Sequence, residues 1–176
     1  MIVLAAWAHG TTVPIREVLI NPPLSRLFVS IEHYQGQLEY PGDALGRDCI
    51  VIEQVNGWPQ MYRGNGKNNE DWHGWGADVL APFFGTVESV EVNLETNRPG
   101  RHTQKPASGI TFLREDGVRV AYAHVADIEV KKGDFVKAGQ RVAKVGNNGF
   151  AWLPHIHVGA WKGQESLQIR FDLEVM

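Results

Sequence analysis

Short segments with alternating apolar and polar side chains dominate the chain from residue 48 onward. Residues 86–92 (Thr-Val-Glu-Ser-Val-Glu-Val) show the two-residue period of a half-buried strand. Comparable short apolar segments, separated by turns such as Asn56-Gly57, lie at 49–55, 77–81, 110–114, 118–124 and 141–145. We find no amphipathic helix longer than two turns. The pattern predicts an all-β fold, a compact antiparallel β-sandwich or barrel of short strands with long loops.

The first 47 residues lack this regularity and are punctuated by prolines and glycines. We therefore expect an N-terminal arm at 1–47 and one domain at 48–176. Residues 1–8 are apolar and uncharged, and they suit either the remnant of an export signal or an apolar arm. His9 and His33 have no partner at metal-ligand spacing, so we expect them to be surface or structural residues.

Composition narrows the classes of partner. The 176 residues carry a formal net charge of −3 and a pI of about 6.1, which gives no electrostatic reason to expect nucleic acid or an anionic membrane. No apolar run reaches the roughly 18 residues that a membrane-spanning helix needs. Cys49 is the only cysteine, which excludes an intramolecular disulfide and a cysteine zinc site. Its apolar surroundings predict a buried core position.

Histidines supply the candidate chemistry. In the segment 153–158, His155 and His157 are two residues apart on a predicted strand, so their side chains point to the same face. His73 and Asp78 flank a turn, and His124 ends another predicted strand. Taken singly, each is more often a hydrogen-bonded polar residue than a ligand, but together they suggest one site.

A catalytic zinc site usually has three protein ligands and one position for water. His73, Asp78 and His157 can supply two imidazoles and one carboxylate, which leaves the metal with a net charge of +1. Zinc lowers the pKa of a bound water to about 7 and polarises a carbonyl oxygen. His124 and His155, near the metal but not on it, can accept a proton from the water and stabilise the oxyanion.

Residues 93–108 form a polar segment too long for a hairpin turn, and we expect a mobile loop bordering a substrate cleft. His102, within this loop, is expected to face solvent rather than to bind a metal. For Trp75 and Trp152 a place at the cleft rim and a place elsewhere are equally open, whereas core packing is favoured for Phe83 and Phe84.

Several of these segments resemble the lysostaphin-type (LytM-like) zinc metallopeptidases, which cut peptide bonds in peptidoglycan. The matching segments, which span about half of the chain in the family's order, are His73 to Pro82 with Gly85-Thr-Val, Tyr122-Ala-His124-Val, residues 130–146, and Asn148-Gly149 with Pro154-His155-Ile-His157. The family usually has three residues between its first histidine and the aspartate, whereas four lie between His73 and Asp78 here.

The resemblance implies zinc held by His73, Asp78 and His157 in a groove between loops, with His124 and His155 as the catalytic pair. It also implies a zinc endopeptidase that acts on peptidoglycan peptides outside the cytoplasm. Separately, we expect the protein to be a monomer. One alternative is a non-catalytic relative that activates other cell-wall hydrolases. A second alternative, a biotinyl- or lipoyl-type carrier suggested by residues 130–145, lacks the modifiable lysine that such a carrier needs.

Overall fold

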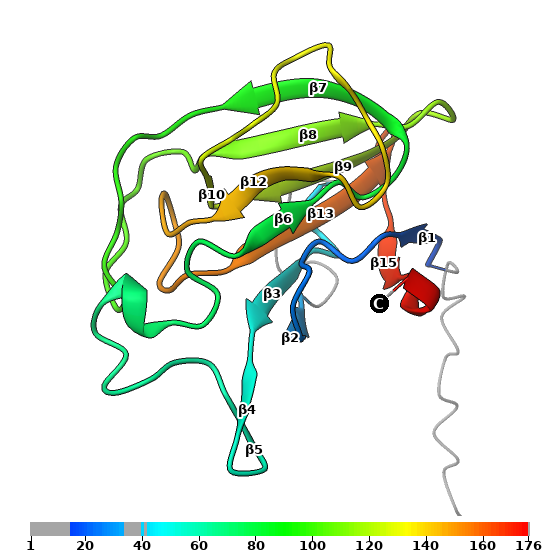
Figure 1. The fold of residues 1–176 in the computed structure, drawn as a ribbon. Helices are drawn as coiled ribbons and strands as arrows, with labels where there is room; N and C mark the ends of the chain where they lie inside the picture. Colours follow the sequence, from blue (N-terminus) through cyan, green and yellow to red (C-terminus); the bar gives the residue numbers. More distant parts are fainter. Residues whose placement is uncertain (1–14, 34–39, 41, 176) are drawn as a thin grey trace, which may run out of the picture.

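A computed structural model describes residues 15–33, 40 and 42–175 (Figure 1). The apolar segment 1–8, expected to be an export-signal remnant or an arm, lies outside the described residues, as does His9. The strands of the structure are β1 (Glu17–Ile20), β2 (Phe28–Glu32), β3 (Arg47–Val51), β4 (Glu53–Val55), β5 (Trp58–Gln60), β6 (Asp78–Leu80), β7 (Gly85–Glu91), β8 (Gly109–Leu113), β9 (Val118–Ala123), β10 (Val125–Ala126), β11 (Phe135–Val136), β12 (Arg141–Val145), β13 (Ile156–Lys162), β14 (Glu165–Ser166) and β15 (Gln168–Phe171). Two short 3₁₀ helices, at Asn69–Asp71 and Leu173–Val175, complete the elements.

The largest sheet has eight strands. Its order is β11-β7-β8-β9-β13-β3-β2, and β14 pairs with β13 beside this path. All of its pairings are antiparallel. A three-stranded sheet, β10-β12-β6, lies against one face of the large sheet (Figure 1). The predicted all-β antiparallel fold is confirmed, and the sheets stay open rather than closing into a barrel.

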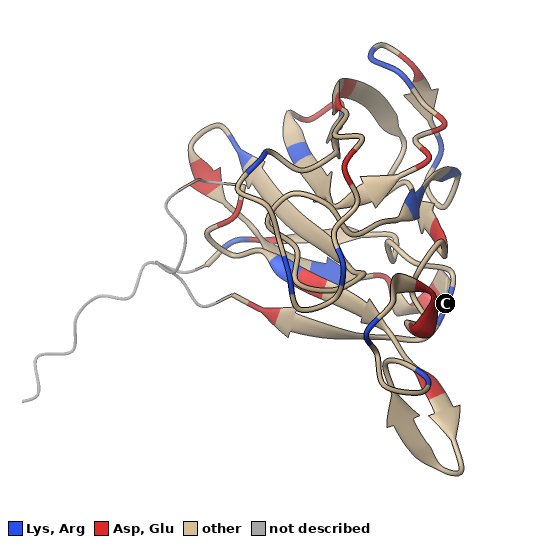
Figure 2. Cartoon of the chain, turned by 90° about the vertical axis from the view of Figure 1, so that its left-hand side faces the viewer, with Lys and Arg blue, Asp and Glu red and all other residues tan. Residues whose placement is uncertain are grey.

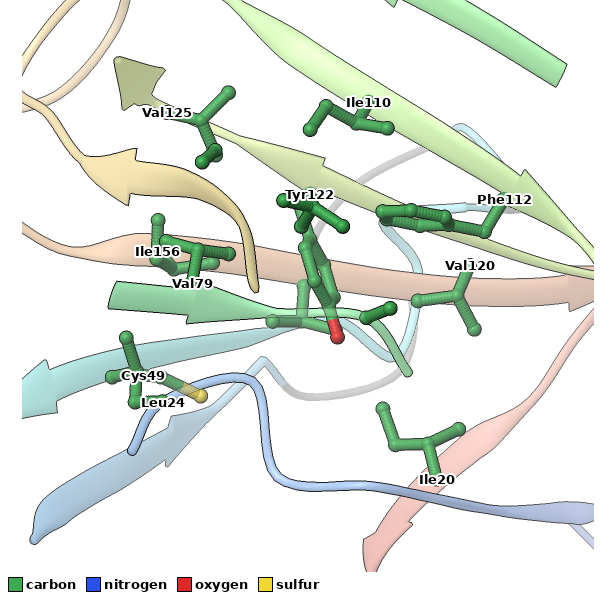
Figure 3. Packing of buried hydrophobic residues seen from close by; sticks show 14 of the residues in the cluster. Ile20, Leu24, Cys49, Val79, Ile110, Phe112, Val120, Tyr122, Val125 and Ile156 are labelled. Carbon is green, nitrogen blue, oxygen red and sulfur yellow. The ribbon is translucent and has the colours of Figure 1, made fainter. Parts of the chain in front are cut away.

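The core lies where the small sheet covers the large one (Figure 3). Along β9 the side chains alternate, so that Val120 and Tyr122 are buried while their neighbours are half-buried. Val79 from β6 and Ile156 from β13 meet them in the same cluster. Cys49 is fully buried, as predicted. Burial of this apolar surface is the main favourable term in folding.

The two phenylalanines of the turn between β6 and β7 behave differently. Phe83 is buried and belongs to the core, as expected. The expectation for Phe84 is wrong, because its side chain is 62% exposed. Consecutive residues at a turn point in different directions, so only one of the two rings reaches the core.

The described part of residues 1–47 is integrated into the sheets. β2 is the edge strand next to β3, and β1 pairs in parallel with β15. The expected boundary between residues 47 and 48 lies inside β3. The division into an arm and a domain stays a prediction, but β1 and β2 belong structurally to the domain.

Acidic and basic residues are both spread along the described chain, with no large region of a single sign (Figure 2). Several form ion pairs between neighbouring strands or loops, such as Arg119 with Glu88 and Arg141 with Glu129. The β4–β5 hairpin projects from the body and carries the exposed Trp58. No helix among the described residues has the length and hydrophobicity to cross a membrane.

Candidate metal and catalytic site

Strand register sets three positions side by side on the outer face of the large sheet. His157 in β13 pairs with Asp48 of β3 on one side and with Ala123 of β9 on the other. Its neighbours Ile156 and Val158 point into the core, so His157 points away from it. His155 lies two residues earlier on the same face, as the sequence predicted, and His124 follows Ala123 directly.

Two further residues reach this face from the ends of loops. His33 follows directly after β2, and its backbone N–H donates to the carbonyl of Gly46. Asp43 lies in the turn before β3, where its backbone N–H donates to the carbonyl of Tyr40. The segment before residue 48 therefore contributes two of the polar side chains at the site.

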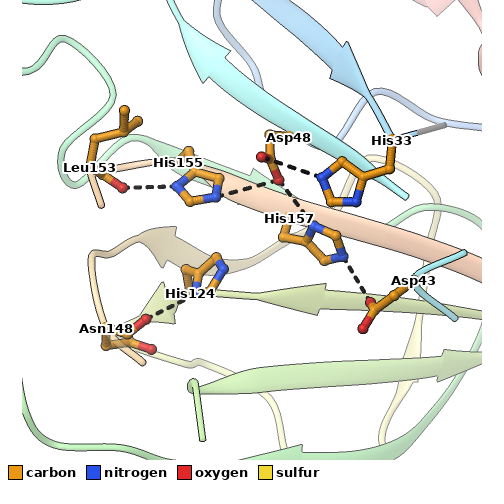
Figure 4. Close-up of polar contacts among 8 residues, drawn as sticks. All are labelled: His33, Asp43, Asp48, His124, Asn148, Leu153, His155 and His157. Carbon is orange, nitrogen blue, oxygen red and sulfur yellow. Dashed lines mark hydrogen bonds and ion pairs between the residues drawn. The ribbon is translucent and has the colours of Figure 1, made fainter. Parts of the chain in front are cut away.

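Asp48 is the centre of the cluster (Figure 4). Its Oδ1 lies 3.0 Å from His157 Nδ1 and 3.5 Å from His155 Nε2, and its Oδ2 lies 3.5 Å from His33 Nε2. The other ring nitrogen of His157, Nε2, lies 2.9 Å from Asp43 Oδ1. The Asp48 carboxylate thus faces three imidazoles, and the Asp43 carboxylate contacts the other nitrogen of the His157 ring.

These contacts shift the pKa values of both partners. Burial alone raises the pKa of Asp48, but hydrogen bonds with His155 and His157 outweigh it and hold this pKa well below its usual range. Burial lowers the pKa of His157, yet the hydrogen bonds to Asp43 and Asp48 raise it to about 9. The hydrogen bond with His157 lowers the pKa of Asp43. Without a metal, the cluster is held together by a charged imidazole between two carboxylates.

His124 and His155 form a second pair beside this cluster, with ring centroids 4.7 Å apart. His124 Nδ1 lies 2.9 Å from the carbonyl oxygen of Asn148, and His155 Nδ1 lies 2.8 Å from that of Leu153. Because a carbonyl only accepts, each Nδ1 carries the proton, and in the neutral ring Nε2 keeps its lone pair. Burial, reinforced by the nearby His155, lowers the pKa of His124 to about 3, so this ring is uncharged at neutral pH.

The backbone at His124 is itself unusual. Its φ of 67° lies in the left-handed region, which costs a residue other than glycine about 1 kcal/mol. This conformation separates β9 from β10 and is fixed by the Gly146 N–H, which donates to the His124 carbonyl. Strain of this kind persists where surrounding contacts hold it, often at functional positions.

All six histidine and aspartate side chains of the cluster and its neighbouring pair open onto one cavity of about 540 Å³. The cavity is lined by Ile31, His33, Asp43, Asp48, Ile50, Ala123, His124, Phe150, Trp152, Leu153, His155 and His157. A cavity of about 620 Å³ lies on another part of the surface, but its lining contains no histidine, and its charged residues pair with one another. The chemistry therefore belongs to the cavity that contains the histidines.

Aromatic rings form one wall of the cavity containing the histidines. The ring of His102 lies between those of Phe150 and Trp152, with centroids 4.2 Å from each in edge-to-face geometry. His102 is half-buried against these rings, and it does not belong to the group of metal-ligating side chains found among the described residues. Phe150 and Trp152 remain more than half exposed at the cavity rim.

The segment 93–108 contains no strand or helix and braces this wall. The buried Asn97 donates from its side chain to the carbonyls of Gly149 and Ala151. The backbone N–H of Gly100 donates to the carbonyl of Trp152. The expected position of 93–108 beside a cleft thus agrees with the contacts, and the segment fixes the loop that carries the aromatic rim.

The structure does not bring His73 and Asp78 to this cavity. His73 is buried beneath the β4–β5 hairpin, where its Nδ1 lies 3.1 Å from Glu53 Oε2. Asp78 pairs across the β6–β12 register with Lys144. Within residues 15–33, 40 and 42–175, the one group of three metal-ligating side chains with all donor atoms within 4.8 Å of one another is His33, Asp48 and His157.

Two residues of that group, His33 and Asp48, are not among the ligands expected from the sequence. The surface or structural role expected for His33 stays a prediction, and the structure places its ring against Asp48 and His157. The reason is physical: Asp48 and His157 meet through strand register across 109 positions of sequence, and spacing along the chain does not encode this. The one local signal was a carboxylate at the start of the buried strand 49–51, where an unpaired charge would be costly.

The donor set fits zinc. Two donors bound at about 2.0–2.1 Å to a tetrahedral zinc are about 3.3 Å apart. The contacts of Asp48 with His157 Nδ1 and His33 Nε2, at 3.0 and 3.5 Å, bracket that separation. Two neutral imidazoles with one carboxylate are also a common catalytic zinc set.

Comparison with known proteins identifies the family. The family model described as "Peptidase family M23" matches residues 71–169, more than half of the chain. The chain belongs to peptidase family M23. The matched range contains His124, His155 and His157, and it begins after His33 and Asp48.

Individual relatives of this M23 chain match over short lengths. A protein of Haemophilus influenzae named an uncharacterized metalloprotease is 35% identical over 82 residues, which is 47% of this chain and 15% of that protein. Lysostaphin of Staphylococcus simulans is 43% identical over 49 residues, which is 27% of this chain and 10% of lysostaphin. The chain thus spans a small part of the length of either relative.

Solved structures share the fold. The catalytic domain of the prophage-encoded M23 protein EnpA from Enterococcus faecalis superimposes with a TM-score of 0.53 at 22% identity, covering 84% of this chain and 92% of that domain. Csd3 from Helicobacter pylori gives a TM-score of 0.51 at 19% identity, covering 88% of this chain and 35% of Csd3. At these identities the likeness concerns the fold.

Proposed function

We propose that this chain is a zinc-dependent endopeptidase that hydrolyses peptide bonds in bacterial peptidoglycan, outside the cytoplasm. The observation that carries the proposal is the convergence of His33, Asp48 and His157 beside His124 and His155 in one open cavity. Family membership supports peptidase chemistry, and the resemblance to lysostaphin-type enzymes supports peptidoglycan peptides as the substrate class.

The metal would be held by His33 through Nε2, by Asp48 through its carboxylate, and by His157 through Nδ1. Zinc supplies Lewis acidity when bound, towards water and towards the carbonyl oxygen of the scissile bond. This ligand set shares His157 with the set predicted from the sequence and replaces His73 and Asp78. Both of those residues already have partners of their own, Glu53 and Lys144.

The remaining pair handles the proton. His124 donates Nδ1–H to the backbone carbonyl of Asn148, which leaves its Nε2 lone pair to accept a proton from the attacking water. His155 donates Nδ1–H to Leu153, which fixes its ring beside Asp48. These hydrogen bonds to backbone carbonyls orient both rings before substrate arrives, and this preorganisation is what acid–base catalysis requires.

The substrate would enter along the aromatic rim. Trp152 and Phe150 offer exposed apolar faces next to the histidines, and their loop is braced by Asn97. An extended peptide lying along this wall brings a backbone carbonyl past the metal ligands. The apolar side chains of Ile31 and Ile50 line the same cavity.

The test is hydrolysis of purified peptidoglycan by zinc-loaded protein, measured as newly released amino groups. We expect His124→Ala and His155→Ala to lower turnover by at least about 100-fold while zinc stays bound, because each removes acid–base help. Wild-type protein that binds zinc but releases no amino groups would instead favour the alternative role, a non-catalytic activator of other hydrolases.

A further inference from the structure

We propose that Asp43 is a positioning residue for the metal site: it holds the proton of His157 on Nε2, so that Nδ1 is the atom presented to the metal. The inference deepens the proposed function and rests on it for the presence of zinc. Asp43 Oδ1 lies 2.9 Å from His157 Nε2, while His157 Nδ1 faces Asp48 on the opposite side of the ring.

The hydrogen-bonding capacities of the His157 imidazole and the Asp43 carboxylate limit where the proton can lie. A neutral imidazole has one N–H and one lone pair, and an ionised carboxylate only accepts. In the metal-free protein both ring nitrogens of His157 face a carboxylate, Asp43 at 2.9 Å and Asp48 at 3.0 Å. With a metal held by Asp48, Nδ1 would give up its proton to bind it, and Asp43 would keep the remaining proton on Nε2. A carboxylate partner of this kind also raises the basicity of a metal-ligating histidine and fixes its ring orientation.

The turn that carries Asp43 is packed tightly on β13, and this is the second observation. A Cβ on Gly159 would lie 1.7 Å from the carbonyl oxygen of Gly42, so only glycine permits the approach. A Cβ on Gly46 would lie 2.8 Å from Cε1 of His157 itself. Asp43 lies between these two contact points, so its place against His157 is set by the backbone on both sides.

Backbone hydrogen bonds fix the turn further. The N–H groups of Asp43 and Ala44 both donate to the carbonyl of Tyr40, and the N–H of Gly46 donates to the carbonyl of Asp43. The carbonyl of Gly46 then accepts from the N–H of His33, a proposed ligand. One turn therefore connects the residue that orients His157 with the residue that supplies a second ligand.

A direct ligand role for Asp43 is the competing interpretation. The lone-pair directions of the two imidazole nitrogens diverge, so a carboxylate on Nε2 is remote from an ion held at Nδ1. Asp43 is also absent from the group of donors that lie within 4.8 Å of one another. Its contact with His157 thus places it behind the ligand, not on the metal.

The experiment measures zinc affinity by competition with a chelating dye for wild type, Asp43→Asn and Asp43→Ala. Removing a residue that orients a ligand typically weakens metal binding by about 10- to 100-fold, and we expect this for Asp43→Ala. Asp43→Asn keeps an oxygen that accepts from Nε2–H and should recover most of the affinity. Asp116→Ala is the matched control, because Asp116 is a similarly exposed aspartate that pairs with Arg114.

A second readout separates positioning from structural support. Long-range ¹H–¹⁵N spectra of zinc-loaded wild type should show the His157 proton on Nε2 and Nδ1 without one. Zinc affinity of Asp43→Ala within about twofold of wild type, or a proton on Nδ1 of zinc-loaded wild type, would overturn the inference. If wild type binds no zinc at all, this inference and the proposed function fail together, whereas bound zinc without hydrolysis removes the hydrolase proposal alone.

Discussion

Two clusters of histidine and carboxylate side chains lie among the described residues, and they differ in what neutralises the carboxylate. In the group formed by Arg26, Glu53 and His73, the guanidinium of Arg26 contacts both Glu53 and the backbone carbonyl of His73. In the group formed by His33, Asp48 and His157, only imidazoles face the central carboxylate. A carboxylate already paired with a permanent cation is a poor metal ligand, because the cation repels the metal.

The two groups also differ in access. The side chain of His73 is 1% exposed, and its Nε2 is buried without a hydrogen-bond partner. His33, Asp48 and His157 line an open cavity with an aromatic rim. Suitable spacing along the sequence therefore does not by itself bring donor atoms to an open cavity, because strand register decides which side chains meet there.

The largest expected effect is on zinc binding and comes from replacing the Asp48 carboxylate. Asp48→Asn should weaken zinc binding by at least about 100-fold, because it removes the charge from a ligand that other donors cannot replace. Asp78→Asn makes the same change at the carboxylate ligand that the sequence predicted, and it should leave the zinc content at the wild-type level. Elemental analysis of both purified variants checks this, and a loss of zinc in Asp78→Asn alone would reverse the assignment.

The next effect is on stability. His73→Ala should lower the free energy of unfolding by about 2–4 kcal/mol, because it leaves a cavity at a buried position and removes the contact of His73 with Glu53. Glu53→Gln should cost about 1 kcal/mol or less, since that carboxylate is partly exposed. Urea unfolding of metal-free protein measures both changes. His73→Ala protein that remains folded but loses zinc would show that His73 is a ligand after all.

The pH dependence of the unfolding free energy should distinguish the contribution of His157 from that of His124. The pKa of His157 is raised from 6.5 to about 9, so its contribution is fully present below pH 6.5 and is lost as the pH rises through about 9. The change in unfolding free energy is up to about 3 kcal/mol, at about 1.4 kcal/mol per pKa unit.

The contribution of His124 to the unfolding free energy changes in the opposite direction. Because the pKa of His124 is lowered to about 3, this contribution is present above pH 6.5 and is lost as the pH falls from 6.5 towards about 3. Unfolding of metal-free protein between pH 6.5 and 9 therefore isolates His157. His157→Asn should flatten the curve in this window, and a wild-type curve that is already flat would contradict the two carboxylate contacts.

The smallest effect concerns the rim. Trp152→Ala should raise KM for peptidoglycan by about 3- to 10-fold with little change in kcat, since an aromatic contact is worth about 0.5–1.5 kcal/mol. Trp58→Ala removes an exposed indole on the projecting hairpin and should change neither constant. Equal effects of the two substitutions would argue against a substrate contact at the rim.

The fold was largely predictable because local signals determine it. Alternating segments such as 118–124 became strands with one buried face, and the turn at Asn56-Gly57 joins β4 to β5. The small apolar Cys49 lies in the core as expected. The pairing partners of residues 17–20 and 28–32 lie outside the arm, in β15 and β3, and the local sequence does not encode these partners.

The site was predictable only in part, for a related reason. His155 and His157 share a face through the strand period, and His124 ends a strand that pairs with theirs, so three of the five expected residues meet. The other two expected residues, His73 and Asp78, do not reach this cavity. They lie near each other in sequence, but they pair with Glu53 and Lys144. Register between distant strands, which placed Asp48 opposite His157, leaves no trace in sequence spacing.

The central claim is the identity of the metal ligands. Crystals of the zinc-loaded protein, measured at the zinc absorption edge, locate the metal by its anomalous scattering. We predict one peak bounded by His33 Nε2, the Asp48 carboxylate and His157 Nδ1, in the cavity that also contains His124 and His155. A peak between His73 and Asp78, or no peak in protein that retains its fold, would contradict the account.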